Sequence, residues 1–414
     1  MALVYIDDLT EGMILAEDLF TPKGFFVLAA GMPLQQDHLQ RLKGWGVVEV
    51  AITEASLGEE YQQLQAEIAQ FVDRAEGYLY RRCHLNDLSK EPLATIFRHT
   101  VNLYAKRLQR GWSPVNCSAD QLPAETNPQQ PPPSAPQLLL GDVELFCLPS
   151  VYARIVQAIN SPNSSSAQVA EAVSKDANLS IRLLRMVNSP SYGFSEKVDS
   201  VTRAVSLLGT DDLTNLAVNV NVRQQFGGIP PQMISMDSFW RHSIRCGLFA
   251  RILAGHLGLP GNEIYFTGGL LHDIGRLVML DRMPDKYGRA IAKGLSEQLP
   301  NYRAEQETLQ TDHSILGKLL AMRWRLPTPV TRMIGGHHSP ASVHYAPEAC
   351  LAHVADFLAH ATGHEVNLVN ELPPLQMKAW EELKLKEEFI APTIRQVEAE
   401  FRKIISFFQQ SGDV

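Results

Sequence analysis

Helical periodicity from Leu138 onward constrains the fold more than any other feature of this sequence. Apolar residues recur three and four positions apart there, in segments of about eight to fifteen residues separated by short breaks. The spacing predicts helices between residues 148 and 188, over 263–280 and over 307–323. Another helix, capped by Asp237 or Ser238, is expected to run to about His256, with Phe239, Phe249 and Leu253 on one face. No run alternates apolar and polar residues as a half-buried strand would. The pattern therefore predicts an all-helical domain.

Residues 1–55 have a different pattern and predict a small mixed α/β domain. Residues 25–30 and 47–52 are expected strands, and Thr21-Pro22-Lys23-Gly24 predicts a turn between two short apolar runs. A short helix from His38 to Lys43, capped by Asp37, is expected to end at Gly44. We interpret this domain as a structural adaptor without chemistry of its own.

The remaining segments complete a predicted order of five parts. Residues 56–112 form a helical arm, with helices over 59–83 and 93–108 that could pack as a hairpin or across a homodimer. Residues 113–137 form a Pro-rich linker with few apolar residues. The helical domain occupies residues 138–365, and helices for packing or dimerisation occupy residues 366–414. The overall fold class is therefore mainly α.

The composition excludes several classes of protein. The chain has 414 residues, of which 45% are hydrophobic and 20% charged, as in ordinary globular proteins. Its 37 Lys and Arg against 45 Asp and Glu give a formal charge of −8, so no nucleic-acid partner is expected. Neither a signal peptide nor an apolar run of membrane-span length is present. The five scattered cysteines form no CxxC pair, which favours reduced thiols and a cytoplasmic location.

Within the helical domain, histidines and aspartates occur among apolar residues. Each one alone is more often a hydrogen-bonded core residue than a ligand. Together they would need many separate buried partners, whereas one shared metal site satisfies all of them. The predicted metal ligands are seven: His242, His272, Asp273, His313, His337, His338 and Asp356.

This number of ligands fits two divalent cations. Asp273 could bridge them, with His242, His272 and Asp356 completing one site. The other site would use His313, His337 and His338. Mixed imidazole and carboxylate ligands favour Fe or Mn, with Zn also compatible. Two such ions could stabilise a phosphoryl transfer and lower the pKa of a bound water.

Several neighbouring residues permit two interpretations. Arg276 lies on the same helical side as Asp273 and could bind a phosphate or form an ion pair. Glu305 and Glu307 could orient His313 or belong to a solvated helix face. We interpret Cys246 as a buried thiol. The remaining nearby histidines are read as surface or structural residues: His344, His353 and His360.

The order of the seven residues resembles that of the HD superfamily of metal-dependent phosphohydrolases, including the HD-GYP cyclic di-GMP phosphodiesterases. Residues 138–360 are more similar to the HDOD family, and residues 1–55 to the small domain that precedes some HD-GYP domains. The motifs that carry the HDOD resemblance are Leu148-Pro149, Leu183 to Ser189, Ala204 to Gly209, Phe239 to Ser243, Gly269 to Gly275, Trp324 to Pro327 and His337-His338.

The resemblance implies two hypotheses for function. HDOD proteins are mostly signalling output modules, which implies a regulatory domain with protein partners or a nucleotide ligand. The HD-GYP-like ligand set implies instead a dinuclear phosphodiesterase or phosphohydrolase for cyclic di-GMP or another nucleotide. In that enzyme Asp273 and Arg276 would be catalytic. The sequence departs from HD-GYP at Arg276, where that family has Lys, and lacks the Gly-Tyr-Pro loop after His337-His338.

Overall fold

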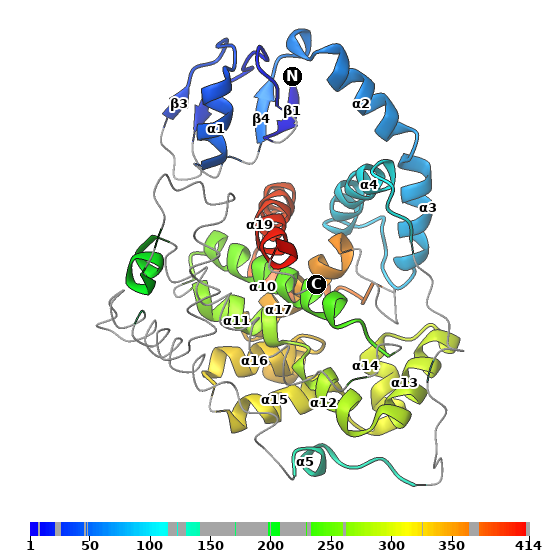
Figure 1. The fold of residues 1–414 in the computed structure, drawn as a ribbon. Coiled ribbons are helices and arrows are strands. Elements are labelled where there is room, and N and C mark those ends of the chain that lie inside the picture. Colours follow the sequence, from blue (N-terminus) through cyan, green and yellow to red (C-terminus); the bar gives the residue numbers. More distant parts are fainter. Residues whose placement is uncertain are drawn as a thin grey trace. The chain divides into compact units, whose positions relative to one another are not determined.

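The structure, a computed structural model, divides into two compact units. It describes residues 1–6, 9–20, 26–44, 47, 49–114, 122, 130–140, 170, 198, 200–207, 229, 233–259, 262–324, 326–363 and 372–410. Unit 1 comprises Met1–Arg81 and Phe97–Ser113, and unit 2 comprises Arg82–Ile96 and Pro114–Val414. Figure 1 shows the elements of both units.

The first part of unit 1 contains two short antiparallel strand pairs and one helix. Strand β1 (Ala2–Tyr5) pairs with β4 (Glu49–Ile52) in the register Ala2 to Ile52, and β2 (Leu19–Phe20) pairs with β3 (Phe26–Leu28). Helix α1 (Gln36–Gly44) and a 3₁₀ turn (Glu54–Ser56) complete it. Val4, Leu42 and Ile52 are fully buried in its core. The mixed α/β prediction is confirmed, although the sequence analysis did not include β1 and β2.

The second part of unit 1 is a helical arm. The predicted single helix over 59–83 is two helices, α2 (Glu59–Ala69) and α3 (Val72–Arg82). The break arises because the Phe71 amide bonds to the Ile68 carbonyl, a tight turn that ends α2. Helix α4 (Leu93–Gln109) follows, and it belongs to this unit from Phe97 onward. Ile68, Leu79 and Tyr104 form the centre of the apolar core of the arm.

All regular elements in the described part of unit 2 are helices, which confirms the mainly α fold class. Residues 201–207 are helical. The helices are α5 (Ala135–Leu138), α10 (Met236–His256), α11 (Asn262–Leu271), α12 (Ile274–Arg282), α13 (Pro284–Glu297), α14 (Asn301–Leu309), α15 (His313–Arg323), α16 (Thr328–Gly336), α17 (Pro347–Thr362), α18 (Met377–Leu383) and α19 (Ile390–Gln410), with 3₁₀ turns at Pro340–Val343 and Glu387–Phe389.

Helix α10 is the central element of unit 2. Helices α11, α17 and α19 pack against it, so apolar residues cover most of its circumference (Figure 1). Leu248, Phe249 and Ala250 are completely buried. Its N-terminal cap is Ser235, whose hydroxyl accepts a hydrogen bond from the Ser238 amide at 3.2 Å. The predicted caps, Asp237 and Ser238, are wrong because both residues lie inside the first turn.

Two further helices were predicted too long. The segment from Glu263 to Leu280 is broken at His272-Asp273, where α11 ends and α12 begins. The segment from Glu307 to Arg323 is broken because Gln310 adopts a left-handed conformation with φ 58°. Asp312 then caps α15 by accepting a hydrogen bond from the Ile315 amide. Both breaks place predicted ligands at helix ends.

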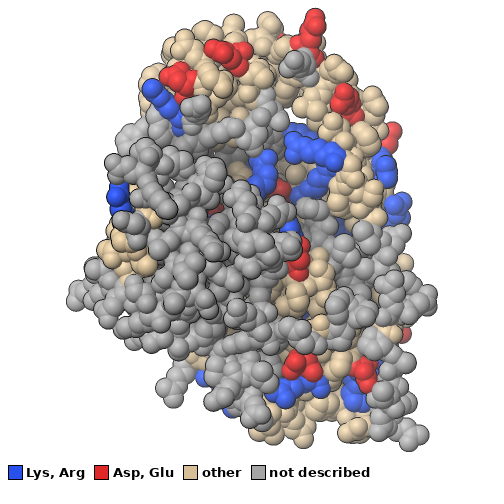
Figure 2. All heavy atoms as spheres, in the orientation of Figure 1, with Lys and Arg blue, Asp and Glu red and all other residues tan. Residues whose placement is uncertain are grey.

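Some predictions cannot be compared with the structure. The helices expected between residues 148 and 188, and most of the predicted linker, lie outside the described residues. At the end of that linker, Ser134 and Gln137 form a capping box that starts α5. Figure 2 shows one face of the molecule, on which the described Asp and Glu side chains are scattered over the surface. None of the described helices combines the length and the apolar character that a membrane crossing requires.

Candidate metal centre

The structure brings all seven predicted ligands together in unit 2. His242 comes from α10, His272 and Asp273 from the break between α11 and α12, and His313 from the first turn of α15. His337 and His338 follow α16, and Asp356 lies on α17. Six of the seven are buried, and His338 is partly exposed. Residues that are widely separated in the sequence therefore form one cluster.

Glycine at position 275 lets α12 approach α15 closely enough to form the cluster. A Cβ atom at Gly275 would lie 2.0 Å from the His313 carbonyl oxygen and 2.7 Å from the Gly317 nitrogen. Both contacts are with backbone atoms, which cannot move as the end of a side chain can. Only glycine therefore allows Asp273 and His313 their present separation.

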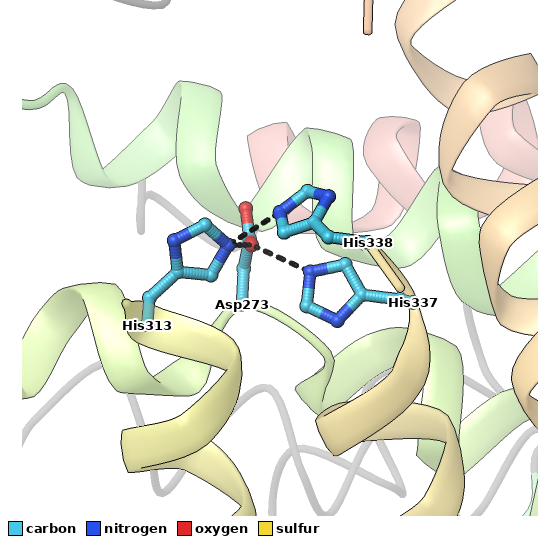
Figure 3. Close-up of side chains that lie close together, drawn as sticks. All are labelled: Asp273, His313, His337 and His338. Carbon is cyan, nitrogen blue, oxygen red and sulfur yellow. Dashed lines mark hydrogen bonds and ion pairs between the residues drawn. The ribbon is translucent and has the colours of Figure 1, made fainter. Parts of the chain in front are cut away.

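The first half of the cluster surrounds Asp273. The Nε2 atoms of His313 and His337 lie 3.0 and 3.7 Å from Asp273 Oδ1. The Nε2 atom of His338 lies 2.7 Å from that of His313. Figure 3 shows the three rings arranged around this carboxylate. One ligand atom from each of the four residues lies within 4.8 Å of the others.

The second half surrounds Asp356. Its Oδ1 atom lies 3.1 Å from His242 Nε2, 3.2 Å from His272 Nε2 and 3.4 Å from His360 Nε2. His272 also approaches the first half, because its Nε2 is 3.6 Å from Asp273 Oδ1. The two halves are thus adjacent, and each is centred on one carboxylate oxygen.

Three of the imidazoles are fixed in the tautomer that a metal ligand needs. The Nδ1 atoms of His272 and His337 lie 2.7 and 2.8 Å from the carbonyl oxygens of Gly269 and Ile334. Since a carbonyl oxygen only accepts, each Nδ1 must carry the proton, and in the neutral ring Nε2 then has a free lone pair. His313 Nδ1 is held in the same way by Glu305 Oε2 at 2.6 Å.

Some of the Nε2 lone pairs lack a hydrogen-bond donor, and a cation would compensate for this. His337 Nε2 is buried and has no hydrogen-bond partner among the described residues. The paired Nε2 atoms, 3.3 Å apart in His242 and His272, cannot both present lone pairs without a shared proton or cation. Imidazole and carboxylate donors at these positions fit a divalent transition metal. The cluster could therefore bind metal.

A buried polar network supports the Asp273 half. Arg276 Nη1 donates to Asp273 Oδ2 at 2.8 Å, and Arg276 Nε donates to the Tyr287 hydroxyl at 3.3 Å. Tyr287 donates to Glu305 Oε1 at 2.9 Å, while the other Glu305 oxygen accepts from both the amide and the ring of His313. The chain of contacts closes on itself, because His313 Nε2 faces Asp273. It holds both ligands in position without metal.

The electrostatics of the two halves differ. Burial favours the neutral form of Asp273, but Arg276, His272 and His313 together hold the pKa of this carboxyl well below its usual range. Burial opposes protonation of His313, but Glu305 and Asp273 raise its pKa to about 10. By contrast, burial and the neighbouring His242 lower the pKa of His360 to about 3. Burial also lowers the pKa of His338 well below its usual value, so that its ring is neutral.

A pocket gives access to the cluster. The empty space in and above it is about 430 Å³, part of which is open solvent. Asp273, His313, His338 and His360 face it from the cluster, with Arg276 beside them. Leu85, Pro300 and Pro373 form much of the remaining wall. The Tyr302 ring stacks on His338 with their centroids 4.5 Å apart.

The structure answers the open interpretations of the neighbouring residues. Glu305 is fully buried against His313, whereas Glu307 is exposed and pairs with Lys293. Cys246 is completely buried. His353 is structural, because its Nδ1 donates to the His337 carbonyl and its Nε2 accepts from the Gln376 amide.

His360 and Tyr287 belong to the cluster but are not among the seven predicted ligands. The His360 side chain is only 13% exposed, so it is not a surface histidine. Its spacing of four residues after Asp356, on one helix face, was the available signal. Tyr287 could not be recognised from local spacing, because its partners Arg276 and Glu305 are eleven and eighteen residues away in the sequence.

Comparison with known proteins identifies the family of the helical domain. The HDOD domain family matches residues 145–340, and the chain therefore contains an HDOD domain. Asp356 and His360 lie beyond the matched residues. An uncharacterised protein of Treponema pallidum (strain Nichols) is 28% identical over 204 residues. That match covers 49% of this chain and 38% of the length of the Treponema protein.

Solved structures share the helical fold. A candidate signal transduction protein from Marinobacter aquaeolei VT8 superposes with a TM-score of 0.53 at 22% identity, covering 67% of this chain and 60% of that one. A candidate phosphohydrolase from Shewanella amazonensis SB2B gives 0.50 at 24% identity, covering 64% of this chain and 97% of that one. At these identities the likeness is one of fold.

Proposed function

We propose that this chain is a signalling protein whose HDOD domain binds divalent metal and acts as a regulatory module in nucleotide second-messenger signalling. One observation carries the metal part of the proposal. The Nε2 atoms of fixed-tautomer histidines converge on the Oδ1 atoms of Asp273 and Asp356. In metal sites, a backbone carbonyl or a carboxylate typically accepts a hydrogen bond from the other ring nitrogen of a ligand histidine and so orients the ring.

The donor set favours Fe or Mn, with Zn as an alternative. Two adjacent groups of ligands support two ions for each chain. One group is Asp273 with His313, His337 and His338, and the other contains His242, His272 and Asp356. We propose all seven as metal ligands.

The side chains that line the pocket beside the cluster favour a ligand with a phosphate group, such as a nucleotide. Arg276 lines this pocket, and its Nη2 atom makes no hydrogen bond to another described residue. A guanidinium held on two sides by Asp273 and Tyr287 is oriented before a phosphate arrives, which lowers the entropic cost of binding. Tyr302 and the two prolines would contact the less polar part of the ligand.

The other parts of the chain are proposed to connect this domain to its signal. The N-terminal domain over residues 1–55 and the arm over 56–112 would receive the input or form a homodimer. The linker over 113–137 would separate them from the domain over 138–365 and its C-terminal helices over 366–414. Signalling proteins or a nucleotide would be the partners, in the cytoplasm.

The opening of the pocket onto Asp273 and Arg276 favours a second function, that of a phosphodiesterase or phosphohydrolase for cyclic di-GMP or another nucleotide. Metal ions bound there would polarise a phosphoryl oxygen and lower the pKa of bound water. Arg276 would hold the phosphate, and Asp273 would hold the metal beside it. Pro300 and Pro373 would exclude bulk water from the phosphate.

One experiment separates the two functions. Protein prepared without oxygen and loaded with Fe or Mn is tested for hydrolysis of cyclic di-GMP and of a generic phosphodiester, and for binding of cyclic di-GMP by calorimetry. Asp273→Ala is the test variant, and Glu307→Gln is the matched control. Metal and ligand binding without turnover support the regulatory function. Turnover that Asp273→Ala abolishes supports the enzyme, and a chain that binds no metal excludes both.

A further inference from the structure

We propose that His360 is an eighth metal ligand, which together with His242 and Asp356 holds a cation in a half of the cluster that does not need Asp273. The proposal rests on the proposed function, because it requires that the cluster binds metal. It differs from the arrangement predicted from the sequence, in which Asp273 bridges both cations. Like Asp356, His360 lies beyond the residues that the HDOD family matches.

The position of His360 is that of a ligand. It lies one turn after Asp356 on α17, so both side chains point from the same face of this helix. Its Nε2 atom is 3.4 Å from Asp356 Oδ1, and its ring centroid is 4.3 Å from that of His242. One ligand atom from each of the three residues lies within 4.8 Å of the others.

The second oxygen of Asp273 is already engaged. In the common two-oxygen bridging mode, a carboxylate gives one oxygen to each of two cations. The imidazoles of His313, His272 and His337 all face Asp273 Oδ1, at 3.0, 3.6 and 3.7 Å. Arg276 Nη1 donates to Oδ2 at 2.8 Å, so a guanidinium stands where a bridged cation would bind. A cation beside Asp356 therefore needs another donor, and His360 is in position to supply it.

His353 on the same helix shows what a structural histidine looks like in this fold. Its ring nitrogens bond to two backbone groups, at 2.6 and 2.9 Å, and neither retains a free lone pair. Among the described residues, no backbone group bonds to the ring of His360. The His360 ring lines the pocket and faces the acid and imidazoles of the cluster. Packing alone does not explain this environment.

The test measures metal content rather than activity. The full chain is stripped with a chelator and titrated with Mn²⁺, and the EPR signal of unbound Mn²⁺ gives the number and affinity of the sites. We expect His360→Gln to lose one site or to weaken it more than about 100-fold, since the change removes a ligand rather than an outer partner. His256→Gln is the control, because that exposed ring stacks on Phe389 outside the cluster.

A double variant tests the reason that His360 is needed. Replacing Arg276 by Gln should release Asp273 Oδ2, so that the carboxylate can bridge. We therefore expect Arg276→Gln combined with His360→Gln to recover the weakened Mn²⁺ site by about 10-fold or more relative to His360→Gln alone. Continued weakness in the double variant would contradict the role given to Arg276.

A measurement on the unchanged chain covers the case in which His360→Gln does not fold. With [¹⁵N]His-labelled protein, Zn²⁺ should shift the ring nitrogen resonances of His360 and leave those of His353 unchanged. If His360→Gln binds Mn²⁺ with wild-type number and affinity, or if the His360 resonances do not respond, His360 is not a ligand while the proposed function stands. If the wild-type chain binds neither ion, the proposed function itself fails.

Discussion

The two halves of the cluster balance the charge of a buried carboxylate in different ways. Asp273 has a guanidinium beside it, and Arg276, Tyr287 and Glu305 form a network that also holds His313. Asp356 is surrounded by the imidazoles of His242, His272 and His360. A buried carboxylate needs a compensating partner. The Asp273 half has a permanent one, whereas the Asp356 half depends on protonated histidine or on a bound cation.

This difference predicts unequal roles for the two halves. The Asp273 half is organised before metal binds, so its geometry should stay the same when a chelator removes the metal. The Asp356 half gains its charge balance only when a cation or proton is present, so it should respond more strongly to metal and to pH. Variants matched across the two halves test this asymmetry.

The largest expected effect is that of Asp273→Ala on the stability of the chelated protein. The substitution leaves the Arg276 guanidinium largely buried without its carboxylate, and breaking such a pair costs about 3–5 kcal/mol. Asp356→Ala leaves imidazoles that can lose their protons, so its cost should be only about 1–3 kcal/mol. Urea unfolding at about pH 7.5 measures both. Equal losses of unfolding free energy in the two variants would show that the two carboxylates are compensated to the same extent.

Gly275→Ala should have the next largest effect. The new methyl group would lie 2.0 Å from the His313 carbonyl oxygen, so α12 and α15 must separate. Overpacking of this kind costs about 1–3 kcal/mol, and it would displace His313 from Asp273 and weaken cation binding in that half. The cation site beside Asp356 should be affected less. Mn²⁺ titration together with urea unfolding distinguishes the loss of a site from a general loss of stability.

Gly294→Ala provides the control for this substitution. Gly294 lies inside α13, and a methyl group added there would meet nothing nearer than the Leu299 carbonyl oxygen at 3.4 Å. Replacing a glycine within a helix by alanine is expected to be neutral or to stabilise by about 0.5–1 kcal/mol. If both variants lose stability and metal to the same extent, close approach at Gly275 is not what positions His313.

The residues of the cluster could be predicted because their chemistry conflicts with their surroundings. Asp273 and Asp356 occur inside apolar helical segments, and His242 and His313 lie near apolar helix faces, which is unusual unless a partner compensates them. Helical periodicity also identified the fold class, because it depends only on local spacing. Both signals can be read without knowing which helices meet.

The arrangement within the cluster could not be predicted in this way. The helix breaks before Asp273 and His313 contain no glycine or proline at the break, so a continuous helix was expected. The contact between Arg276 and Tyr287 depends on how α12 packs on α13, which local spacing does not encode. His360 resembled its neighbour His353 in the sequence, and only their hydrogen-bond partners separate them.

A smaller and more local effect is expected from Glu305→Gln. The Glu305 carboxylate accepts from the amide and ring of His313, while Tyr287 and Asn301 donate to its other oxygen. An amide at this position loses the charge and one acceptor, so His313 is oriented less firmly. Mn²⁺ affinity in the Asp273 half should fall about 10-fold to 100-fold. The exposed Glu307→Gln variant should bind as the wild type does, and a similar loss there would contradict a specific role for Glu305.

The effect that separates the halves most directly is the pH dependence of stability in the chelated protein. The folded-state pKa of His313 is raised to about 10 by Glu305 and Asp273 despite its burial. Its contribution to stability is therefore complete below its unfolded pKa of about 6.5 and is lost as the pH rises toward 10. His313→Gln should flatten the decline in unfolding free energy between about pH 7 and 9.

His360 should show the opposite sign. Burial and His242 lower its folded-state pKa to about 3, so the unfolded chain binds a proton at this position that the folded chain does not. Stability is therefore lost as the pH falls below about 6.5, and His360→Gln should reduce this loss between about pH 6.5 and 4.5. Urea unfolding across both ranges compares the two variants with the wild type. We expect the unfolding free energy to change its slope against pH in opposite directions in the two variants. If both variants change this slope in the same direction, the two halves do not balance their charges separately.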